Sequence, residues 1–309
     1  MLYLTCKEKM RILITGATGL VGTHLTNLFQ QKGIEVNYLT TSRNKIKKIH
    51  GYQGYYWDPE KGEMDHTALD GVNAVIHLAG AGIANRWTES YKKEIIDSRV
   101  KSAKLLYNTL QNIPHQVGRF ISASGIGVYP DSLEKLYSED DQGVDDSFVG
   151  EVVERWESAA MEFIDLGINV SIIRLGMVLA KEGGALPKLQ EPTAFNVGAP
   201  LGSGKQWQSW IHIEDIAGIF NYVLENDLDG IYNAVAPNPV TNKELVECIA
   251  KNMGNSVWLP RIPAVALKLA LGEMSHVVLS SQLVSSEKIE KAGYSFKYKN
   301  LSKALEDLI

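Results

Sequence analysis

The stretch RILITGATGLVGTHL, residues 11–25, constrains what this chain can fold into more than any other part of its sequence. An apolar strand runs into a turn that contains Gly16, Gly19 and Gly22, and a helix with an apolar face follows at once. Glycines at such a turn let backbone N–H groups approach a pyrophosphate, and the N-terminus of the helix attracts the anion. A purely structural turn is the alternative, but the flanking strand and helix favour dinucleotide binding. The expected cofactor contacts are Gly16, Thr18, Gly19, Leu20, Val21 and Gly22.

The second strand, expected at residues 34–43, predicts which dinucleotide binds. Proteins selective for NAD usually place an acidic residue at the end of this strand, where it binds the ribose 2′-hydroxyl. No acidic residue occurs between Glu35 and Asp58, whereas the segment 43–48 is rich in lysine and arginine. Because a 2′-phosphate would be attracted there, we expect NADP(H), with NAD(H) as the alternative. A solvated basic loop would give the same pattern. The contacts expected for the phosphate are Ser42 and Arg43.

Two later strands are expected to end beside the same ligand. The segment GYYWDP at 54–59 closes the third strand near the adenine. In AVIHLAGAGI at 74–83, small residues follow a buried strand and would let a cofactor lie across them. The contacts expected from these strands are Trp57, Asp58, Leu78, Ala79 and Gly80.

The order of elements predicts the fold class. Strand patterns alternate with helical patterns as far as residue 176, which is typical of an α/β fold with a doubly wound parallel sheet of the Rossmann type. A segment rich in glycine and proline follows, after which a helix at 212–226 and a strand at 230–236 return to the sheet. A smaller C-terminal α/β lobe should therefore interleave with the first domain. The expected division assigns 1–180 and 211–236 to the nucleotide-binding domain, and 181–210 and 237–309 to the substrate-binding lobe.

Blocks of sequence spread over nearly the whole chain carry a resemblance to a known family. The turn ITGATGLVG, the segment HLAG and the strand RFISASGIGVYP occur in that order, and more specific blocks follow. Together they resemble the extended short-chain dehydrogenases/reductases, and within them an atypical branch, the epimerase family, whose members are described as nucleoside-diphosphate-sugar epimerases. The end of the chain resembles the C-terminal extension of that branch. The blocks similar to the branch lie at 86–106, 153–160, 200–218, 233–245 and 269–298.

The resemblance implies hydride transfer between a nicotinamide and a substrate carbon that bears oxygen. In that superfamily a Tyr-x-x-x-Lys pair handles the substrate proton, because the lysine charge lowers the pKa of the tyrosine. The register of the strand RFISASGIGVYP places this pair at Val149 and Val153, which cannot transfer protons. Among the 13 tyrosines only Tyr3 has a lysine, Lys7, at the required spacing, and it precedes the first strand.

Polar residues near the expected edge of the sheet are candidates for the missing chemistry. The resemblance puts a serine or threonine at Gly125, whose neighbour Ser124 would take this role. It also matches Arg99 to an arginine of the branch, which would hold the nicotinamide end or a substrate phosphate. Each candidate has a structural alternative as a packed or hydrogen-bonded group. The candidates are Ser124, Tyr129 and His212 for catalysis, Ser122, Ala123 and Arg99 for the cofactor, and Glu139 as a further acid or base.

The segment at 181–212 resembles the substrate-binding excursion of the family. Its polar side chains would meet a phosphate or a polar head group and its tryptophans would stack on a ring, although all of them could simply pack. Histidine is suited to proton transfer because its charge changes near neutral pH. The expected partner is a small molecule, with a nucleotide-linked one among the options. The expected substrate contacts are Lys205, Gln206, Trp210 and His212.

Two helical segments carry apolar faces with competing interpretations. The segment 147–160 has an apolar stripe at helical spacing, which predicts a core or dimer-interface helix. The parent superfamily pairs the helices at 89–112 and 148–166 in a dimer, so a homodimer is expected by resemblance. The segment 263–279 is apolar enough for a membrane-surface helix, but it has a single lysine, which favours a buried helix lining the substrate lobe.

Composition argues against several other roles. The net charge of −5 argues against a nucleic-acid partner, and no apolar run approaches the roughly 20 residues that span a membrane. Cys6 and Cys248 alone can build neither a disulfide framework nor a metal site, which fits a cytoplasmic protein without an export signal. Two hypotheses remain. One is an NADP(H)-dependent oxidoreductase or epimerase with unconventional proton handling, and the other is a non-catalytic NADP(H)-binding sensor or scaffold.

Overall fold

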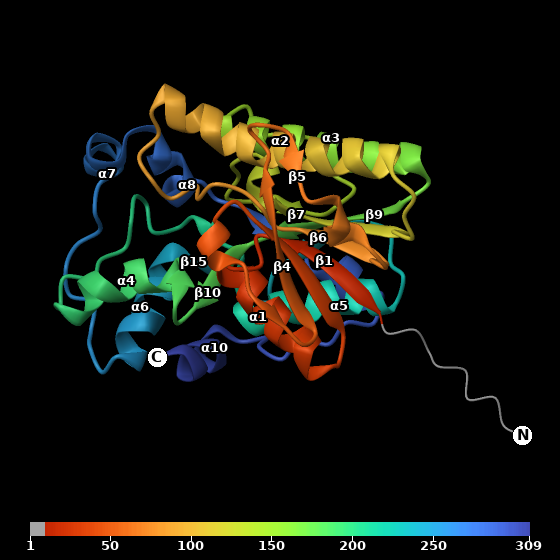
Figure 1. Ribbon diagram of the computed structural model, residues 1–309. Helices are drawn as coiled ribbons and strands as arrows, with labels where there is room; N and C mark the ends of the chain where they lie inside the picture. Colours follow the sequence, from red (N-terminus) through yellow and green to blue (C-terminus); the bar gives the residue numbers. More distant parts are fainter. Residues whose placement is uncertain (1–9) are drawn as a thin grey trace, which may run out of the picture.

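A nine-stranded, mostly parallel sheet lies at the centre of the protein in a computed structural model that describes residues 10–309 (Figure 1). The strand order is β14-β9-β7-β6-β1-β2-β4-β3, with β5 paired to β4. This order confirms the predicted doubly wound α/β fold. The parallel strands are β1 Arg11–Thr15, β2 Glu35–Thr40, β4 Tyr52–Asp58, β6 Ala74–His77, β7 Arg119–Gly125, β9 Asn169–Leu175 and β14 Gly230–Ala234. The antiparallel additions are β3 Lys48–Ile49 and β5 Glu63–Met64.

Helices cover both faces of the sheet (Figure 1). The helices α1 (Leu20–Gln31) and α5 (Ile213–Glu225) pack together over one face. The helices α2 (Glu89–Asn112) and α3 (Phe148–Met161) cover the other, with the turn η4 (Glu162–Leu166) continuing α3. Strand β1 lies between β2 and β6, where the strand order reverses. A doubly wound sheet binds its ligand in the crevice at the carboxyl ends of the strands at this point.

Most of the remaining elements gather on the side to which the carboxyl ends of the parallel strands point (Figure 1), whereas the turn η2 (His66–Leu69) packs on β2. Small strand pairs tie them to the loops that follow β7 and β9. The strands are β8 Leu136–Tyr137, β10 Met177–Ala180, β11 Gly183–Gly184, β12 Trp207–Gln208, β13 Trp210–His212, β15 Val240–Thr241 and β16 Leu283–Val284. The helices are α4 Leu186–Ala194, α6 Asn242–Asn252, α7 Ala264–Leu271, α8 Ser275–Leu279, α9 Glu287–Lys291 and α10 Leu301–Leu308. The turns are η1 Arg43–Lys45, η2 His66–Leu69, η3 Ile126–Val128 and η5 Gly272–Met274.

The prediction of one buried helix at 263–279 is wrong. The segment forms α7, the turn η5 and α8, because the first helix ends at Gly272, whose φ is +62°. Only Leu267 of α7 is buried, while Val265 and Leu269 are largely exposed. Apolar composition alone therefore gave the wrong burial for this segment.

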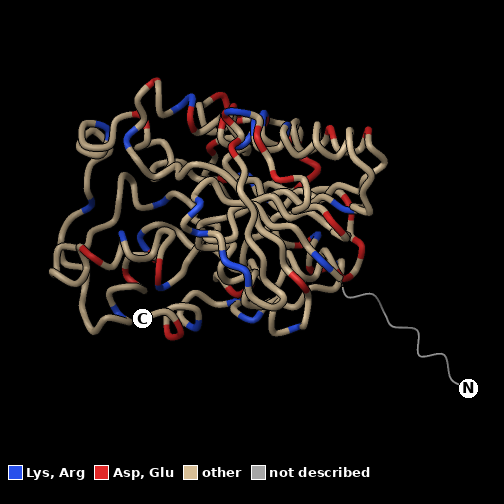
Figure 2. The backbone as a smooth tube through the Cα atoms, in the orientation of Figure 1, with Lys and Arg blue, Asp and Glu red and all other residues tan. Residues whose placement is uncertain are grey.

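Two further observations concern the surface. Among residues 10–309, no helix is both long enough and apolar enough to cross a membrane. Figure 2 shows lysine and arginine interspersed with aspartate and glutamate along both the sheet domain and the smaller lobe.

Candidate cofactor cleft

The glycine turn after β1 is built for close backbone approach. Gly16 has φ of +71°, and a Cβ there would lie 2.9 Å from the Leu78 carbonyl. A Cβ on Gly22 would lie 2.2 Å from the Gly16 carbonyl oxygen, so only glycine lets α1 pack against the turn. The N-cap of α1 is Gly19, and no side chain caps the first N–H groups of the helix. These uncapped N–H groups give the site the donors and partial positive charge that an anion requires.

A buried serine–histidine–threonine chain fixes the loop after β6. The Thr15 hydroxyl accepts hydrogen bonds of 3.1 Å from the N–H groups of Leu78 and Ala79, and lies 2.8 Å from His77 Nδ1. Its proton therefore points to His77, whose Nε2 lies 3.2 Å from the Ser102 hydroxyl. Burial lowers the pKa of His77 to about 4, so the ring is neutral. This hydrogen-bonded chain was not predicted from the sequence, although a polar residue at the end of each of two apolar strands was the signal for it.

The basic segment after β2 lies beside β4. Strand β2 ends at Thr40, earlier than expected, so Arg43 begins the turn η1 and Ser42 is its N-cap, and neither lies on a strand. The guanidinium carbon of Arg43 lies 3.9 Å from the centroid of the Tyr56 ring, and the side chain makes no ion pair with residues 10–309. This leaves its hydrogen-bond donors available for a phosphate.

At the end of β4, Trp57 and Asp58 already have partners within the protein. Trp57 is buried in the core beneath the strand end. The Asp58 carboxylate accepts hydrogen bonds from the N–H groups of Glu60 and Lys61 and pairs with the Lys61 ammonium at 3.0 Å. Both residues thus have structural partners at the place where adenine contacts were expected.

Arg99 lies beneath the loop after β6. Its guanidinium donates to the Ile95 and Ala81 carbonyls at 2.8 and 3.1 Å and stacks 4.8 Å from the Trp156 ring. A Cβ on Gly80 would lie 2.9 Å from its guanidinium carbon, so Arg99 supports this glycine directly. Burial lowers the pKa of Arg99 to about 10, which leaves it charged at neutral pH. These contacts are those of a packed, hydrogen-bonded arginine, the structural alternative to a cofactor contact.

A buried polar network joins β7, β9 and α3. The Ser124 hydroxyl donates to Glu157 at 2.6 Å, and Arg174 binds the same carboxylate through two hydrogen bonds of 2.8 Å. Arg174 also donates to the Tyr129 hydroxyl at 2.9 Å, which donates to Asn233 at 2.9 Å. Glu157 and Arg174 were missed from the sequence, because the parallel register that sets Arg174 opposite Ser124 is not visible in one chain segment.

Neighbours of this network complete the edge of the sheet. The Ser122 hydroxyl donates to the carbonyl of Ala123 at 2.9 Å. Glu139 is buried and accepts a hydrogen bond of 2.7 Å from the Asn233 N–H, and burial raises its pKa. These groups are therefore satisfied within the protein.

The positions where the family resemblance places tyrosine and lysine are apolar contacts here. Val149 packs so closely on the turn after β7 that a Cβ on Gly127 would lie 2.4 Å from its Cγ1. Val153 is buried and faces Gly125. The predicted apolar stripe is buried at Val152, Val153, Trp156 and Ala160 of the helix and at Phe163 in η4, whereas Val149 is half-buried. The other Tyr-x-x-x-Lys spacing, Tyr3 with Lys7, lies outside the described residues.

The expected substrate contacts mostly hold the smaller lobe together. His212 caps α5 by accepting a hydrogen bond from the Glu214 N–H at 3.1 Å, stacks 3.8 Å from the Tyr298 ring and is buried, which lowers its pKa. Trp210 is fully buried and donates to the Asn238 carbonyl. Gln206 is buried against the Leu201 and Val278 carbonyls. Lys205 alone of the four is exposed.

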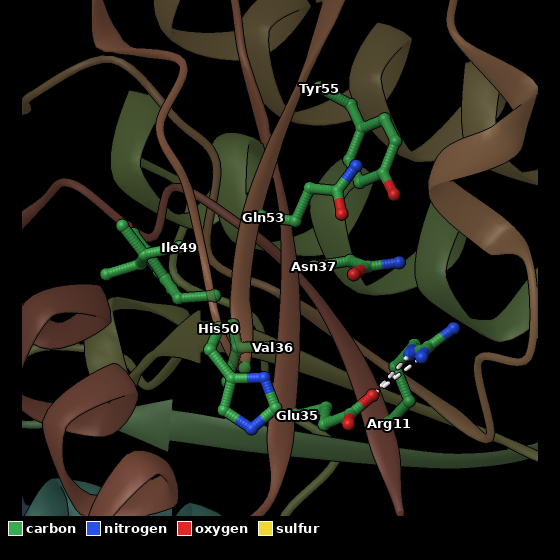
Figure 3. A pocket seen from close by; sticks show the side chains of 10 residues that line it. Arg11, Glu35, Val36, Asn37, Ile49, His50, Gln53 and Tyr55 are labelled. Carbon is green, nitrogen blue, oxygen red and sulfur yellow. Dashed lines mark hydrogen bonds and ion pairs between the residues drawn. The ribbon is translucent and has the colours of Figure 1, made fainter.

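A cavity of about 250 Å³ lies at the opposite edge of the sheet (Figure 3). Its walls come from the amino-terminal ends of β1, β2 and β4, where Arg11 pairs with Glu35 at 2.6 Å. Because the glycine turn follows the carboxyl end of β1, this cavity is separate from the candidate cofactor cleft.

Comparison with known families identifies two matching regions. Residues 12–146 match the model of the NAD dependent epimerase/dehydratase family. Residues 262–308 match a domain of unknown function, DUF1731. Epimerase family proteins of Staphylococcus saprophyticus and Staphylococcus aureus are each 36% identical, over 96% of this chain and 98% of their own length.

Solved structures agree with this placement. The human epimerase family protein SDR39U1, crystallised with NADPH, is 30% identical with a TM-score of 0.83, covering 97% of this chain and 99% of that one. A nucleoside-diphosphate sugar epimerase from Corynebacterium glutamicum is 31% identical with a TM-score of 0.77, covering 97% of this chain and 58% of that one. A UDP-glucuronic acid 4-epimerase from Bacillus cereus, at 18% identity and a TM-score of 0.77 with 97% and 98% covered, shares the fold.

Proposed function

Since the chain belongs to the epimerase family, of the NAD-dependent epimerase/dehydratase type, we propose that it is an NADP(H)-dependent oxidoreductase or epimerase. The observation that carries this proposal is the glycine turn, where Gly16 and Gly22 bring the backbone together and the N-terminus of α1 stays uncapped. A bound nicotinamide would supply or accept a hydride at a substrate carbon that bears oxygen. The protein's own residues bind the dinucleotide and orient the substrate.

The choice of NADP(H) over NAD(H) rests on η1. Arg43 is held against Tyr56 with its donors unpaired by residues 10–309, and Ser42 precedes it as the N-cap of η1. A guanidinium in this position binds a 2′-phosphate with charge-assisted hydrogen bonds. The human relative crystallised with NADPH supports the same preference.

We propose a small polar substrate and place sugar nucleotides first among the classes to test. The relative from Corynebacterium glutamicum, described as a nucleoside-diphosphate sugar epimerase, supports this choice. The substrate would lie between the sheet and the smaller lobe, with the exposed Lys205 among its contacts. We assign residues 1–180 and 211–236 to cofactor binding and the rest to the substrate lobe. The buried network of Ser124 and Glu157 positions the end of β7 beneath this site.

A second candidate function is a non-catalytic NADP(H)-binding sensor or scaffold. The observation that favours it is specific: Val149 and Val153 fill with apolar atoms the positions where the family resemblance expects the proton-handling pair. Both candidates require the same cofactor site, so they differ only in turnover.

Two measurements test the proposal. Isothermal titration calorimetry of the wild type with NADPH and with NADH should give clearly tighter binding of NADPH. NMR of UDP-sugars incubated with the protein and NADP⁺ should show an epimer or an oxidised product. Absence of NADPH binding refutes both candidate functions. Tight binding without conversion of any sugar nucleotide leaves the sensor as the better account of this chain and removes the sugar-nucleotide substrate class.

We also propose a homodimer through α2 and α3, as in the parent superfamily. Met161 and Ile164, at the end of α3 and in η4, are exposed apolar side chains on this helical layer. Sedimentation equilibrium of the wild type and of Ile164→Glu should separate a dimer from a monomer; a monomeric wild type refutes this arrangement.

A further inference from the structure

None of the three residues expected for catalysis offers an accessible group for proton transfer. Ser124, Tyr129 and His212 are only 2%, 0% and 1% exposed. Tyr129 and His212 are also committed to hydrogen bonds that hold β9 and α5. An enzyme of the proposed kind needs an acid or base that reaches the substrate oxygen. That group must come from elsewhere in the fold.

His276 on α8 has the features that the site lacks. Its Nε2 lies 3.3 Å from the Asp145 carboxylate, and the two side chains are 34% and 5% exposed. Asp145 is fixed because its carboxylate accepts a hydrogen bond from the Ser147 N–H at 3.0 Å and its N–H donates to the Val128 carbonyl at 2.8 Å. An accessible imidazole beside a buried carboxylate is a common arrangement for a general acid or base.

The position of α8 places this pair at the correct edge of the sheet. Asp145 belongs to the loop that joins β7 to α3, one helical turn before Val149. The segments on both sides of α8 are anchored to this part of the fold. Glu273, in the turn η5 before α8, forms an ion pair with Lys92 at the start of α2. After α8, the Ser281 N–H donates to Asp131, in the loop that follows β7, at 2.7 Å. Figure 1 shows α8 between the smaller lobe and the start of α2.

The charged groups on the segments next to α8 have partners of their own. Lys92 pairs with both Glu273 and Glu89, and Asp131 accepts a hydrogen bond from the backbone of the segment after α8. Another accessible histidine with an acidic neighbour, His24, lies 3.7 Å from Glu182, but that carboxylate is 65% exposed and cannot hold the ring in one orientation. The buried carboxylate therefore distinguishes His276.

We propose that His276 is the catalytic acid/base of this protein and that Asp145 is its positioning residue, an inference that rests on the proposed oxidoreductase or epimerase function. In the oxidation of a secondary alcohol, the neutral imidazole accepts the hydroxyl proton while the carbon gives a hydride, with its two electrons, to oxidised nicotinamide. The O–H and C–H bonds break, the C=O bond forms, and the products are a ketone, an imidazolium and a reduced nicotinamide. Reduction reverses each transfer.

The first test uses ligand contact and does not depend on turnover. The imidazole resonances of His276, assigned by their loss in His276→Gln, are followed by NMR in the wild-type protein. NADPH should shift them, whereas adenosine 2′,5′-bisphosphate, which lacks the nicotinamide, should leave them in place. Equal responses to the two ligands overturn the inference. Failure of NADPH to bind at all refutes the proposed function instead, so the two failures are distinguishable.

The second test uses the NADPH-dependent reduction of phenanthrenequinone, followed by loss of NADPH absorbance. His276→Gln should lower kcat at least about 100-fold, the usual contribution of general acid catalysis, with the NADPH dissociation constant unchanged. Asp145→Asn should lower kcat by a smaller factor and leave KM unchanged, because Asp145 acts on the reaction only by positioning His276. His66→Gln, an exposed histidine on η2, is the matched control and should behave as wild type.

Each contrary result in the second test is decisive. A wild type that binds NADPH but does not reduce the quinone overturns the inference, as does a His276→Gln variant with wild-type kcat. A variant that loses activity only because it unfolds would also lose NADPH binding and the circular dichroism signal of the folded protein. In that case the NMR test, which uses the folded wild type, decides whether His276 contacts the ligand. A wild-type kcat in Asp145→Asn, or a loss that appears in KM alone, removes the positioning role.

Discussion

The Ser124 hydroxyl at the end of β7 donates a 2.6 Å hydrogen bond to the Glu157 carboxylate on α3. The same carboxylate carries both hydrogen bonds from Arg174, and the two charged side chains are almost completely buried. Removing one partner of such a pair leaves the other charge uncompensated in a poorly solvated site. The carboxyl edge of the sheet beneath the candidate cleft therefore depends on both charges.

Glu157→Gln should lower the free energy of unfolding by about 3–5 kcal/mol, the usual cost of breaking a buried ion pair. The amide keeps an acceptor for Ser124 but leaves Arg174 without its counter-charge. Urea denaturation followed by circular dichroism measures the change. The double variant Glu157→Gln/Arg174→Met should recover part of the loss. Lys93→Gln removes an exposed pair with Asp97 and should cost less than about 1 kcal/mol; equal losses in the two single variants would contradict this account.

Gly16→Ala should impair both folding and cofactor binding. Gly16 has a left-handed backbone with φ of +71°, which alanine adopts only with strain, and the added Cβ would lie 2.9 Å from the backbone of Leu78. Gly33→Ala is the matched control, because Gly33 has φ of +73° but nothing within 4 Å of a Cβ. The control should lose only about 1 kcal/mol of stability, from backbone strain alone. Urea denaturation and NADPH titration should show a larger loss of stability and weaker binding for Gly16→Ala only.

The fold was predictable because its signals are local. A strand, a glycine turn and a helix with an apolar face follow each other within residues 11–25, and the same alternation continues along the chain. The stripe of α3 was also predictable, since helical spacing alone determines which residues face the core. In each of these elements the sequence pattern and the final packing depend on the same neighbouring residues.

The candidate site was less predictable because its contacts join distant segments. Gln206 and Trp210 have the residue types of ligand contacts, but they satisfy backbone carbonyls inside the smaller lobe. Arg174 pairs with Glu157 only because β7 and β9 are in register. The pair of His276 and Asp145 joins segments more than a hundred residues apart. Periodicity within one segment contains no information about such pairings.

Arg43→Ala should weaken NADPH binding much more than NADH binding. We expect a loss of about 10- to 100-fold for NADPH, equivalent to roughly 1.4–2.7 kcal/mol, because a charge-assisted pair with the 2′-phosphate is removed. The NADH dissociation constant should change little, since NADH has no phosphate at that position. Isothermal titration calorimetry of both cofactors measures the ratio. Lys61→Ala, which removes a lysine paired with Asp58, is the control; equal losses for the two cofactors in Arg43→Ala would refute the phosphate assignment.

His77 should make the protein less stable in mildly acidic solution. Burial lowers its pKa from the ordinary 6.5 to about 4, so below pH 6.5 the unfolded chain binds a proton that the folded protein does not. The contribution of neutral His77 to the free energy of unfolding is fully present above pH 6.5 and is lost as the pH falls towards 4. The total loss is about 3 kcal/mol, since each pKa unit corresponds to about 1.36 kcal/mol. Urea denaturation across this range should show the decline in the wild type. His77→Asn, although less stable throughout, should decline less steeply because it has no group to protonate, and parallel curves for the two proteins would show that His77 is not the residue responsible.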